Sequence, residues 1–445
     1  MEIKDLFITP IYIALIYALA YFIRPGVTDE YNKRYFIPGL TLKIIGALAL
    51  GIIYQFYYGG GDTFTYFNLG SKYIWQAFFD DPVVALKLAF AGSEYAGDTF
   101  QYASKIYTYG DFSSYFVVRI AGILDILTYH TYSSTAILFA TMSFSGLWAM
   151  YHVFYRMFPK LHFKLAIAIF FIPSVFFWGS GILKDTITLG ALGWATYGIY
   201  YLAIARKHLI PSAFILLLSI YTIYTIKIYI LLCFLPAAIL WVAYMRMEKV
   251  RNLVLKIMIA PLVIGVAAVG GYYSIAKVAE DNPRYNLETI TTTAEETARW
   301  IHYVSEREQG SAYTLGDFDY SPAGILRKFP LAVWVTFYRP YLWESHNIVM
   351  LLSALESFAL LLFTIYVLYK VKFGRAVKLI ASRPILTFCF LFSIIFAFAV
   401  GVTTYNFGTL VRYKIPMYPY FVTGLFILLS YAKRDKNRSA LESAE

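Results

Sequence analysis

Side chains able to do chemistry stand at the ends of long apolar segments of this chain. The segment 173–188 carries the adjacent pair Lys184 and Asp185 between two apolar stretches. A charged pair in such a place is costly unless it faces water, so it predicts a working site at a membrane surface. Asp62 follows three glycines and precedes Tyr66 by about one helical turn. A carboxylate there could act as a general base toward the hydroxyl of an acceptor.

Three further cations stand beside apolar segments: Lys227, Arg339 and Arg412. A guanidinium group suits phosphate, which it binds through two parallel hydrogen bonds. The positive bias of cytoplasmic loops does not account for arginines at the outer ends of spans, where we place Arg339 and Arg412. The sequence therefore predicts a site for a phosphate-bearing substrate. The expected catalytic residues are Asp62 and Asp185, and the expected substrate-binding residues are Lys184, Arg339, Arg412, Tyr413, Tyr66 and Lys227.

Each of these features also has a structural explanation, which the residues alone leave open. The glycines before Asp62 could end one helix in the left-handed conformation, with Asp62 capping the next helix. Lys184 and Asp185 could neutralise each other, with the carboxylate at a positive helix N-terminus. Lys227 could extend its ammonium to the membrane surface from a turn between two spans.

The composition is that of a polytopic membrane protein. Of 445 residues, 59% are apolar and 15% are charged, and the mean hydropathy is +0.59; a soluble domain is excluded. We assign the net charge of +11 to basic cytoplasmic loops rather than to nucleic-acid binding. Cys233 and Cys389 both lie in apolar runs, so a disulfide framework or a thiolate metal site is not expected. No cofactor is expected, although outer carboxylates could hold a divalent cation.

About eleven apolar runs are long enough to cross a hydrocarbon core of ~30 Å. Clusters of lysine and arginine lie between them and should face the cytoplasm. Eleven spans with the N-terminus outside and the C-terminus in the cytoplasm place all the clusters there, within one integral membrane domain, 1–445. The expected spans are 7–23, 36–57, 133–155, 165–180, 186–204, 209–225, 228–245, 253–276, 347–369, 384–402 and 414–432.

Two apolar segments, 114–130 and 329–343, are not counted as spans. Both contain charged residues, and counting 114–130 would place the next basic cluster outside. We expect both to be re-entrant or interfacial helices on the outer face. Two long outer loops follow from this topology, 58–113 and 277–345, the second of which includes the re-entrant segment. The polar motifs then gather on one face.

The run 412–419, which reads RYKIPMYP, resembles the R-Y-x-x-P-x-x-P motif of the polytopic glycosyltransferases of the GT-C superfamily, including mannosyltransferase-like bacterial members. That motif stands at the outer end of a late span. The acidic residue Asp62 in the first outer loop and the segment 173–185, which ends in an outward-facing charged pair, are also similar to the layout of this superfamily. The resemblance covers most of the membrane core.

The resemblance implies a GT-C-like fold and an enzyme of a bacterial inner (plasma) membrane. Such an enzyme takes a sugar from a polyprenyl-phosphate carrier and transfers it, with inversion, to a glycan or lipid acceptor on the extracytoplasmic face. By the same resemblance, Asp62 would be the catalytic residue of the first outer loop, Asp185 the second acidic position, and Arg412 a ligand of the carrier phosphate. The implied partners are the polyprenyl-linked donor, the acceptor and membrane lipids.

Three other functions remain open. The segment 182–191 resembles a span start of O-antigen and exopolysaccharide polymerases, which use polyprenyl-diphosphate-linked repeat units, with Lys184 in place of arginine. A transporter or lipid flippase without catalytic chemistry would need charges through the bilayer depth, whereas the charges here gather at the outer rim. A structural subunit of a secretion machine is the third alternative.

Overall fold

The computed structural model is helical throughout the residues it describes. These are 1–91, 97–247, 322–404 and 406–442, with 295–296, 299–300, 303, 313 and 315–316. No strand occurs among them, so the predicted all-α class is confirmed for this part of the chain. The contacts divide the chain into two compact units, the first formed by 1–202 with 207–228 and the second by 203–206 with 229–445. The sequence does not predict this division.

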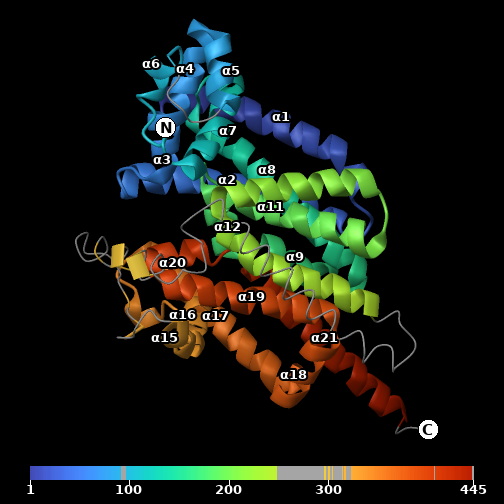
Figure 1. The fold of residues 1–445 in the computed structure, drawn as a ribbon. Helices are drawn as coiled ribbons and strands as arrows, with labels where there is room; N and C mark the ends of the chain where they lie inside the picture. The colour runs from blue at the N-terminus through green and yellow to red at the C-terminus, as the bar shows by residue number, and fades with distance from the viewer. Residues whose placement is uncertain are drawn as a thin grey trace. The chain divides into compact units, whose positions relative to one another are not determined.

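The first unit contains the helices drawn from blue to green in Figure 1. Several continue directly into a π-helical turn, as α2 does into η1 and α11 into η4. In chain order they are α1 (Ile3–Val27), α2 (Lys33–Ile52), η1 (Ile53–Tyr57), α3 (Asp62–Tyr66), η2 (Phe67–Ser71), α4 (Lys72–Asp80), α5 (Pro82–Phe90), α6 (Phe100–Ala103), α7 (Phe112–Thr128), α8 (Tyr132–Met157), η3 (Pro159–Leu161), α9 (His162–Phe170), α10 (Pro173–Trp178), α11 (Lys184–Ile199), η4 (Tyr200–Ala205) and the first part of α12 (Leu209–Met247).

The second unit continues from α12, and its described core is formed by α16, α17, α19 and α21, which pack on one another. Gly401 of α19 lies so close to α16 that an added Cβ would be 2.3 Å from the Ala332 carbonyl oxygen. The helices are α15 (Pro322–Arg327), α16 (Phe329–Tyr338), η6 (Leu342–Glu344), α17 (Ile348–Val371), α18 (Phe373–Ser382), α19 (Pro384–Thr403), α20 (Phe407–Tyr413) and α21 (Tyr418–Glu442).

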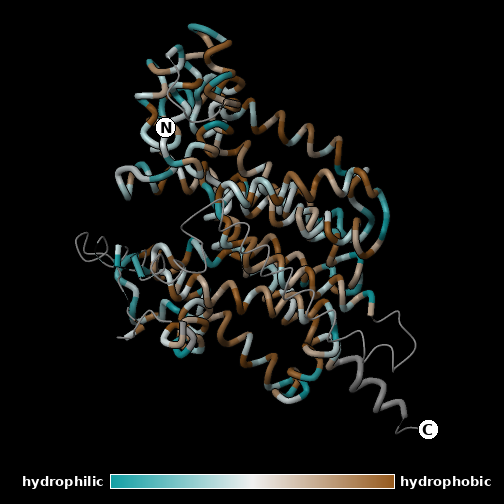
Figure 2. Tube along the Cα trace, in the orientation of Figure 1, coloured by the Kyte–Doolittle hydropathy of each residue, from teal (hydrophilic) through white to brown (hydrophobic). Residues whose placement is uncertain are grey.

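Seven of the described helices are long and apolar enough to cross a membrane: α1, α2 with η1, α8, α11 with η4, α12, α17 and α19. The pair α20 and α21, bent by 64° at its break, would be an eighth. Figure 2 shows that these helices are largely apolar along their length. The prediction of a helical multi-pass membrane protein agrees with this result. The number of eleven spans stays a prediction, and the expected span 253–276 lies outside the described residues.

Three of the expected spans differ from the structure. The run 165–180 is not one helix but the short helices α9 and α10. The break falls just before Pro173, whose ring cannot continue a helix from the preceding turn. The runs 209–225 and 228–245 form one 39-residue helix, α12, in which Lys227 has non-helical backbone angles (φ −146°, ψ 74°). The break expected between these two runs is therefore confined to the non-helical backbone angles of one residue, Lys227.

Glycine allows a close contact between α8 and α11. A Cβ added to Gly146 would lie 1.9 Å from the Gly190 carbonyl oxygen, and one added to Gly193 would lie 2.1 Å from the Gly146 carbonyl oxygen. Small residues let two helix backbones approach in this way, as is common between membrane helices. This contact holds α11, and with it Lys184 and Asp185, against the body of the unit.

A buried lysine satisfies the broken backbone between α10 and α11. Lys43, in the middle of α2, is 1% exposed. Its ammonium donates to the Gly179 carbonyl at the end of α10 and, at 3.5 Å, to the Val175 carbonyl. The Ser180 hydroxyl donates to the Phe176 carbonyl. Buried backbone groups need such partners because an unpaired carbonyl away from water costs free energy.

The described residues of 58–130 form a helical layer beside the ends of the long helices (Figure 1). Its central helix is α7, which packs on α3, α4, α5, α8 and α11. The 17 residues of α7 cover about 26 Å, less than a hydrocarbon core of ~30 Å. This length agrees with the expectation that 114–130 is not a full span. Its place at the membrane interface stays a prediction.

The glycine contact gives a test of this packing. We expect Gly146→Ala to lower the unfolding free energy by about 1–3 kcal/mol, because the added methyl group overpacks α8 against α11. Gly26→Ala in α1 is the matched control, since nothing lies within 4 Å of its Cβ position. Thermal unfolding of the purified protein in detergent compares them. An unchanged midpoint for Gly146→Ala would contradict the close contact.

Candidate functional site

The predicted residues Asp185 and Lys227 form a buried ion pair in the first unit. The Lys227 ammonium contacts Asp185 Oδ1, and the two side chains are 7% and 1% exposed. Lys227 stands at the break of α12 and Asp185 in the first turn of α11. The pair therefore joins two helices at their irregular points. Lys227 does not reach the surface from a turn, which was the alternative left open by its sequence.

Lys184, the neighbour of Asp185, contacts a different helix. Its ammonium donates to the Ser113 hydroxyl at 2.6 Å and lies 3.3 Å from Asp111 Oδ2. Asp111 caps the N-terminus of α7 by accepting from the Ser113 backbone amide at 3.1 Å. Burial alone would raise the Asp111 pKa, but the Ser114 hydroxyl and the Lys184 ammonium outweigh it and lower this pKa to about 2. The carboxylate is therefore charged at neutral pH.

Asp62 begins α3 directly after the glycine turn. Gly59, Gly60 and Gly61 all have positive φ angles, of 69°, 144° and 127°, a region that favours glycine. Gly61 is the N-cap residue, and Asp62 stands exposed in the first turn. Both the structural and the catalytic interpretation of Asp62 fit this position. Tyr66, at the other end of α3, is only 5% exposed.

A cavity of about 700 Å³ opens in the helical layer that contains α3 and α7. One part of its lining is aromatic and the other can exchange hydrogen bonds. The Tyr102 hydroxyl donates to Asp80 Oδ2 at 2.6 Å, so part of this polar lining is already ordered. The sequence analysis did not identify this cavity. It is lined by Trp75, Phe79, Tyr102 and Tyr129, and by Gln76, Asp80, Gln101 and Lys105.

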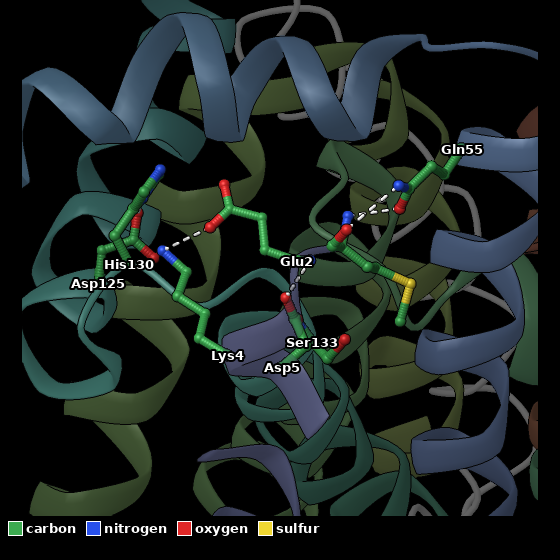
Figure 3. Close-up of polar contacts among 8 residues, drawn as sticks. Glu2, Lys4, Asp5, Gln55, Asp125, His130 and Ser133 are labelled. Carbon is green, nitrogen blue, oxygen red and sulfur yellow. Dashed lines mark hydrogen bonds and ion pairs between the residues drawn. The ribbon is translucent and has the colours of Figure 1, made fainter. Parts of the chain in front are cut away.

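A histidine–aspartate pair stands next to this cavity. His130 Nδ1 lies 2.8 Å from Asp125 Oδ2, and the Thr135 hydroxyl donates to Asp125 Oδ1 at 2.6 Å. The His130 ring is stacked on Phe67 and on Trp75, with ring centroids 3.9 and 5.5 Å away. Figure 3 shows this pair beside the first turn of α1. The Asp125 carboxylate orients the imidazole and fixes its tautomer.

The first turn of α1 is tied to the start of α8. Asp5 Oδ1 accepts from the Ser133 backbone amide at 2.7 Å, and Asp5 Oδ2 accepts from the Glu2 amide at 2.7 Å. The Glu2 and Lys4 side chains form an ion pair of 3.2 Å (Figure 3). Because Ser133 follows His130 closely in the chain, its bond to Asp5 fixes the segment around His130 to the first turn of α1.

The second unit contains the predicted residue Arg339 in a box of aromatic rings. Its guanidinium donates through two nitrogens to the Glu344 carboxylate. The guanidinium carbon lies 4.9 Å from the centre of the Phe407 ring and 5.3 Å from that of Tyr313. The bidentate face expected to meet phosphate is therefore occupied by a carboxylate. A phosphate would have to displace Glu344.

Lys414 replaces Arg412 as the most buried cation of the predicted RYKIPMYP run. Lys414 is 0% exposed, and its ammonium donates to the Arg339 carbonyl at 2.9 Å and to the Ser357 hydroxyl at 3.0 Å. Arg412 and Tyr413 end α20 and are half-buried. The phosphate-binding role of Arg412 and Tyr413 stays a prediction.

The structure thus gathers part of the predicted site within one unit. Asp62, Tyr66, Lys184, Asp185 and Lys227 belong to the first unit, and Arg339, Arg412 and Tyr413 belong to the second. Among the described residues, no group of three or more histidine, cysteine or acidic side chains could hold a metal ion.

No family model, no curated protein and no solved structure matches this chain. The resemblance to the GT-C superfamily therefore rests on the short motifs alone.

The buried pair gives a second test. Either Asp185→Asn or Lys227→Met should lower the unfolding free energy by about 3–5 kcal/mol, because the opposite charge beside the remaining group is lost in a buried place. The double variant should recover most of this loss. Lys184→Met, which removes a neighbouring half-buried cation, should cost about 1 kcal/mol or less. Chemical unfolding in detergent measures all four variants; losses that simply add in the double variant would contradict the pairing.

Proposed function

We propose that this protein is a membrane-embedded glycosyltransferase that takes a sugar from a polyprenyl-phosphate-linked donor. The acceptor is a glycan or lipid at the extracytoplasmic face of a bacterial inner membrane. The observation that carries the proposal is the cavity of about 700 Å³ lined by both aromatic and polar side chains. A sugar ring has apolar faces that stack on aromatic rings, and its hydroxyl groups need hydrogen-bond partners at its edge. Trp75 with Gln76, Asp80 and Gln101 provides both.

α7 is a shared neighbour of the helix that lines this cavity and of the helices that begin with the predicted residues. α7 packs on α4, which lines the cavity, on α3, which begins with Asp62, and on α11, which begins with Lys184. Asp62 is exposed at its helix start, whereas Asp185 is buried against Lys227. In the proposed enzyme Asp62 is therefore the catalytic base, and Asp185 is a positioning residue that orders the start of α11.

In the proposed reaction, an acceptor hydroxyl attacks the anomeric carbon of the donor sugar. The new carbon–oxygen bond forms as the bond from that carbon to the carrier phosphate breaks, with inversion. Asp62 takes the hydroxyl proton, and the bonding electron pair leaves on the phosphate oxygen. A cation near the leaving oxygen stabilises the developing charge. Lys184 suits this role because its ammonium can donate three hydrogen bonds.

The proposal predicts a large effect at Asp62. Asp62→Asn should lower sugar transfer by about 100-fold or more, because an amide cannot accept the hydroxyl proton. The assay uses membranes containing the full chain, with radiolabelled polyprenyl-phosphate mannose and polyprenyl-phosphate glucose as donors. Glu30→Gln, an exposed acidic residue before α2, is the control and should retain full activity. Equal activity of Asp62→Asn and Glu30→Gln would refute the catalytic role.

The cavity can be tested separately from the base. Trp75→Ala should raise the KM for the acceptor roughly tenfold, because the stacking surface is lost, with a smaller effect on kcat. Trp343→Ala, which removes an exposed tryptophan of the second unit, should change neither constant. Movement of the labelled donor across a liposome bilayer without any transfer of sugar would instead support a flippase.

A further inference from the structure

A second cavity, of about 720 Å³, lies at the other end of the first unit from Lys184. It is bounded by α1, α2, α8 and the C-terminal part of α11 with η4. Lys184 begins α11, whereas the lining residue Tyr201 follows its last turn. At 1.5 Å per residue, about 26 Å of helix separates the two positions, close to the thickness of a hydrocarbon core. The proposed glycosyltransferase site does not use this cavity.

One wall of the cavity is apolar and belongs to membrane-length helices. It is formed by Ile16, Leu19 and Ile23 of α1, by Phe36 and Leu40 of α2, and by Phe144 of α8. Leu19 is 55% exposed although it faces the cavity, so the groove beside α1 is not closed by protein. An acyl chain that enters the groove would bury the exposed Leu19 side chain in apolar contact.

The end of the cavity is polar and has an excess of positive charge. Arg156 Nη1 donates to the Tyr201 hydroxyl at 3.0 Å, and this hydroxyl lies 3.0 Å from His152 Nε2. Tyr201 can therefore accept from the arginine while it donates to the histidine, which orients both. Lys207 and His208 also line this end, and both are exposed.

One carboxylate, that of Asp29, lines the cavity as well. Its Oδ1 accepts from the backbone amides of Tyr31 and Asn32 at 2.9 and 3.0 Å. Asp29 thus orders the turn before α2. The charges of Arg156 and Lys207 exceed that of this carboxylate, so the polar end favours an anion.

We propose that this cavity binds an anionic glycerophospholipid. The phosphate contacts Arg156 and Lys207, and one acyl chain lies along the apolar wall of α1, α2 and α8. Arginine and lysine side chains are common ligands of phosphate, and Arg156 and Lys207 both line the polar end of this cavity. The wall of membrane helices favours a lipid over free phosphate, because a soluble anion would gain nothing from the apolar surface. The bound lipid would hold α1 against the rest of the first unit.

The experiment uses the full chain, purified in a neutral detergent, and measures bound lipid by native mass spectrometry. Phosphatidylglycerol should bind saturably, and phosphatidylcholine, with no net charge, should bind at least about tenfold more weakly. The double variant Arg156→Gln/Lys207→Gln should weaken phosphatidylglycerol binding roughly tenfold. Arg34→Gln/Lys160→Gln removes the same two charge types from exposed positions at the same end, outside the cavity lining, and should bind as the unchanged chain does.

A second measurement, of tryptophan fluorescence, gives a result even if the charge variants fail to fold. Trp148 and Trp194 line the cavity, so phosphatidylglycerol with brominated acyl chains should quench part of the tryptophan fluorescence. Trp194→Phe should lose a share of that quenching. Equal quenching by brominated phosphatidylcholine, or full competition by inorganic phosphate, would overturn the proposal. The result is separate from sugar transfer, because none of these residues belongs to the proposed catalytic site.

Discussion

The first unit depends on how a buried break in its backbone obtains hydrogen-bond partners. α10 ends at Trp178, and the chain must turn before α11 can begin at Lys184. Free carbonyl groups there would each cost several kcal/mol in a place that water does not reach. The Lys43 ammonium supplies the donors from the middle of α2. Because this break is stabilised, α11 can start with a buried carboxylate instead of continuing an apolar span.

The long helices could be predicted from the sequence because their signal is local. Mean hydropathy over about twenty residues identifies α1, α8, α17 and α19 without any knowledge of partners. The run 165–180 shows where this measure fails, since it averages over the proline that ends α9. The role of Lys43 could not be predicted from the sequence either. Its partners lie more than a hundred residues away, and no local pattern records them.

The candidate site was predicted in part. Asp62, Lys184 and Asp185 were recognised because charges in an apolar chain are rare, and they do lie in one unit. Their partners were missed, although the spacing of Asp111 before Ser113 and Ser114 is that of a helix cap. Trp75 and Phe79 are four residues apart, a spacing that places two side chains on one face of a helix, but the sequence analysis did not use it. In the second unit the sequence analysis selected Arg412 as the functional cation, whereas the structure buries Lys414. Which of these two side chains is buried depends on the orientation of α20, and the sequence does not give that orientation.

The two buried lysines of the first unit, Lys43 and Lys227, differ in whether their partners are synthesised before or after them. Asp185 is synthesised before Lys227, so the carboxylate is already present when the cation of α12 enters the bilayer. The carbonyls of Val175 and Gly179 emerge long after Lys43. A lysine at the centre of a span opposes insertion by about 2.5–3.5 kcal/mol, and α2 must carry this cost alone. The mean hydropathy of 2.0 along α2 and η1 favours insertion and offsets this cost before the partners of Lys43 are synthesised.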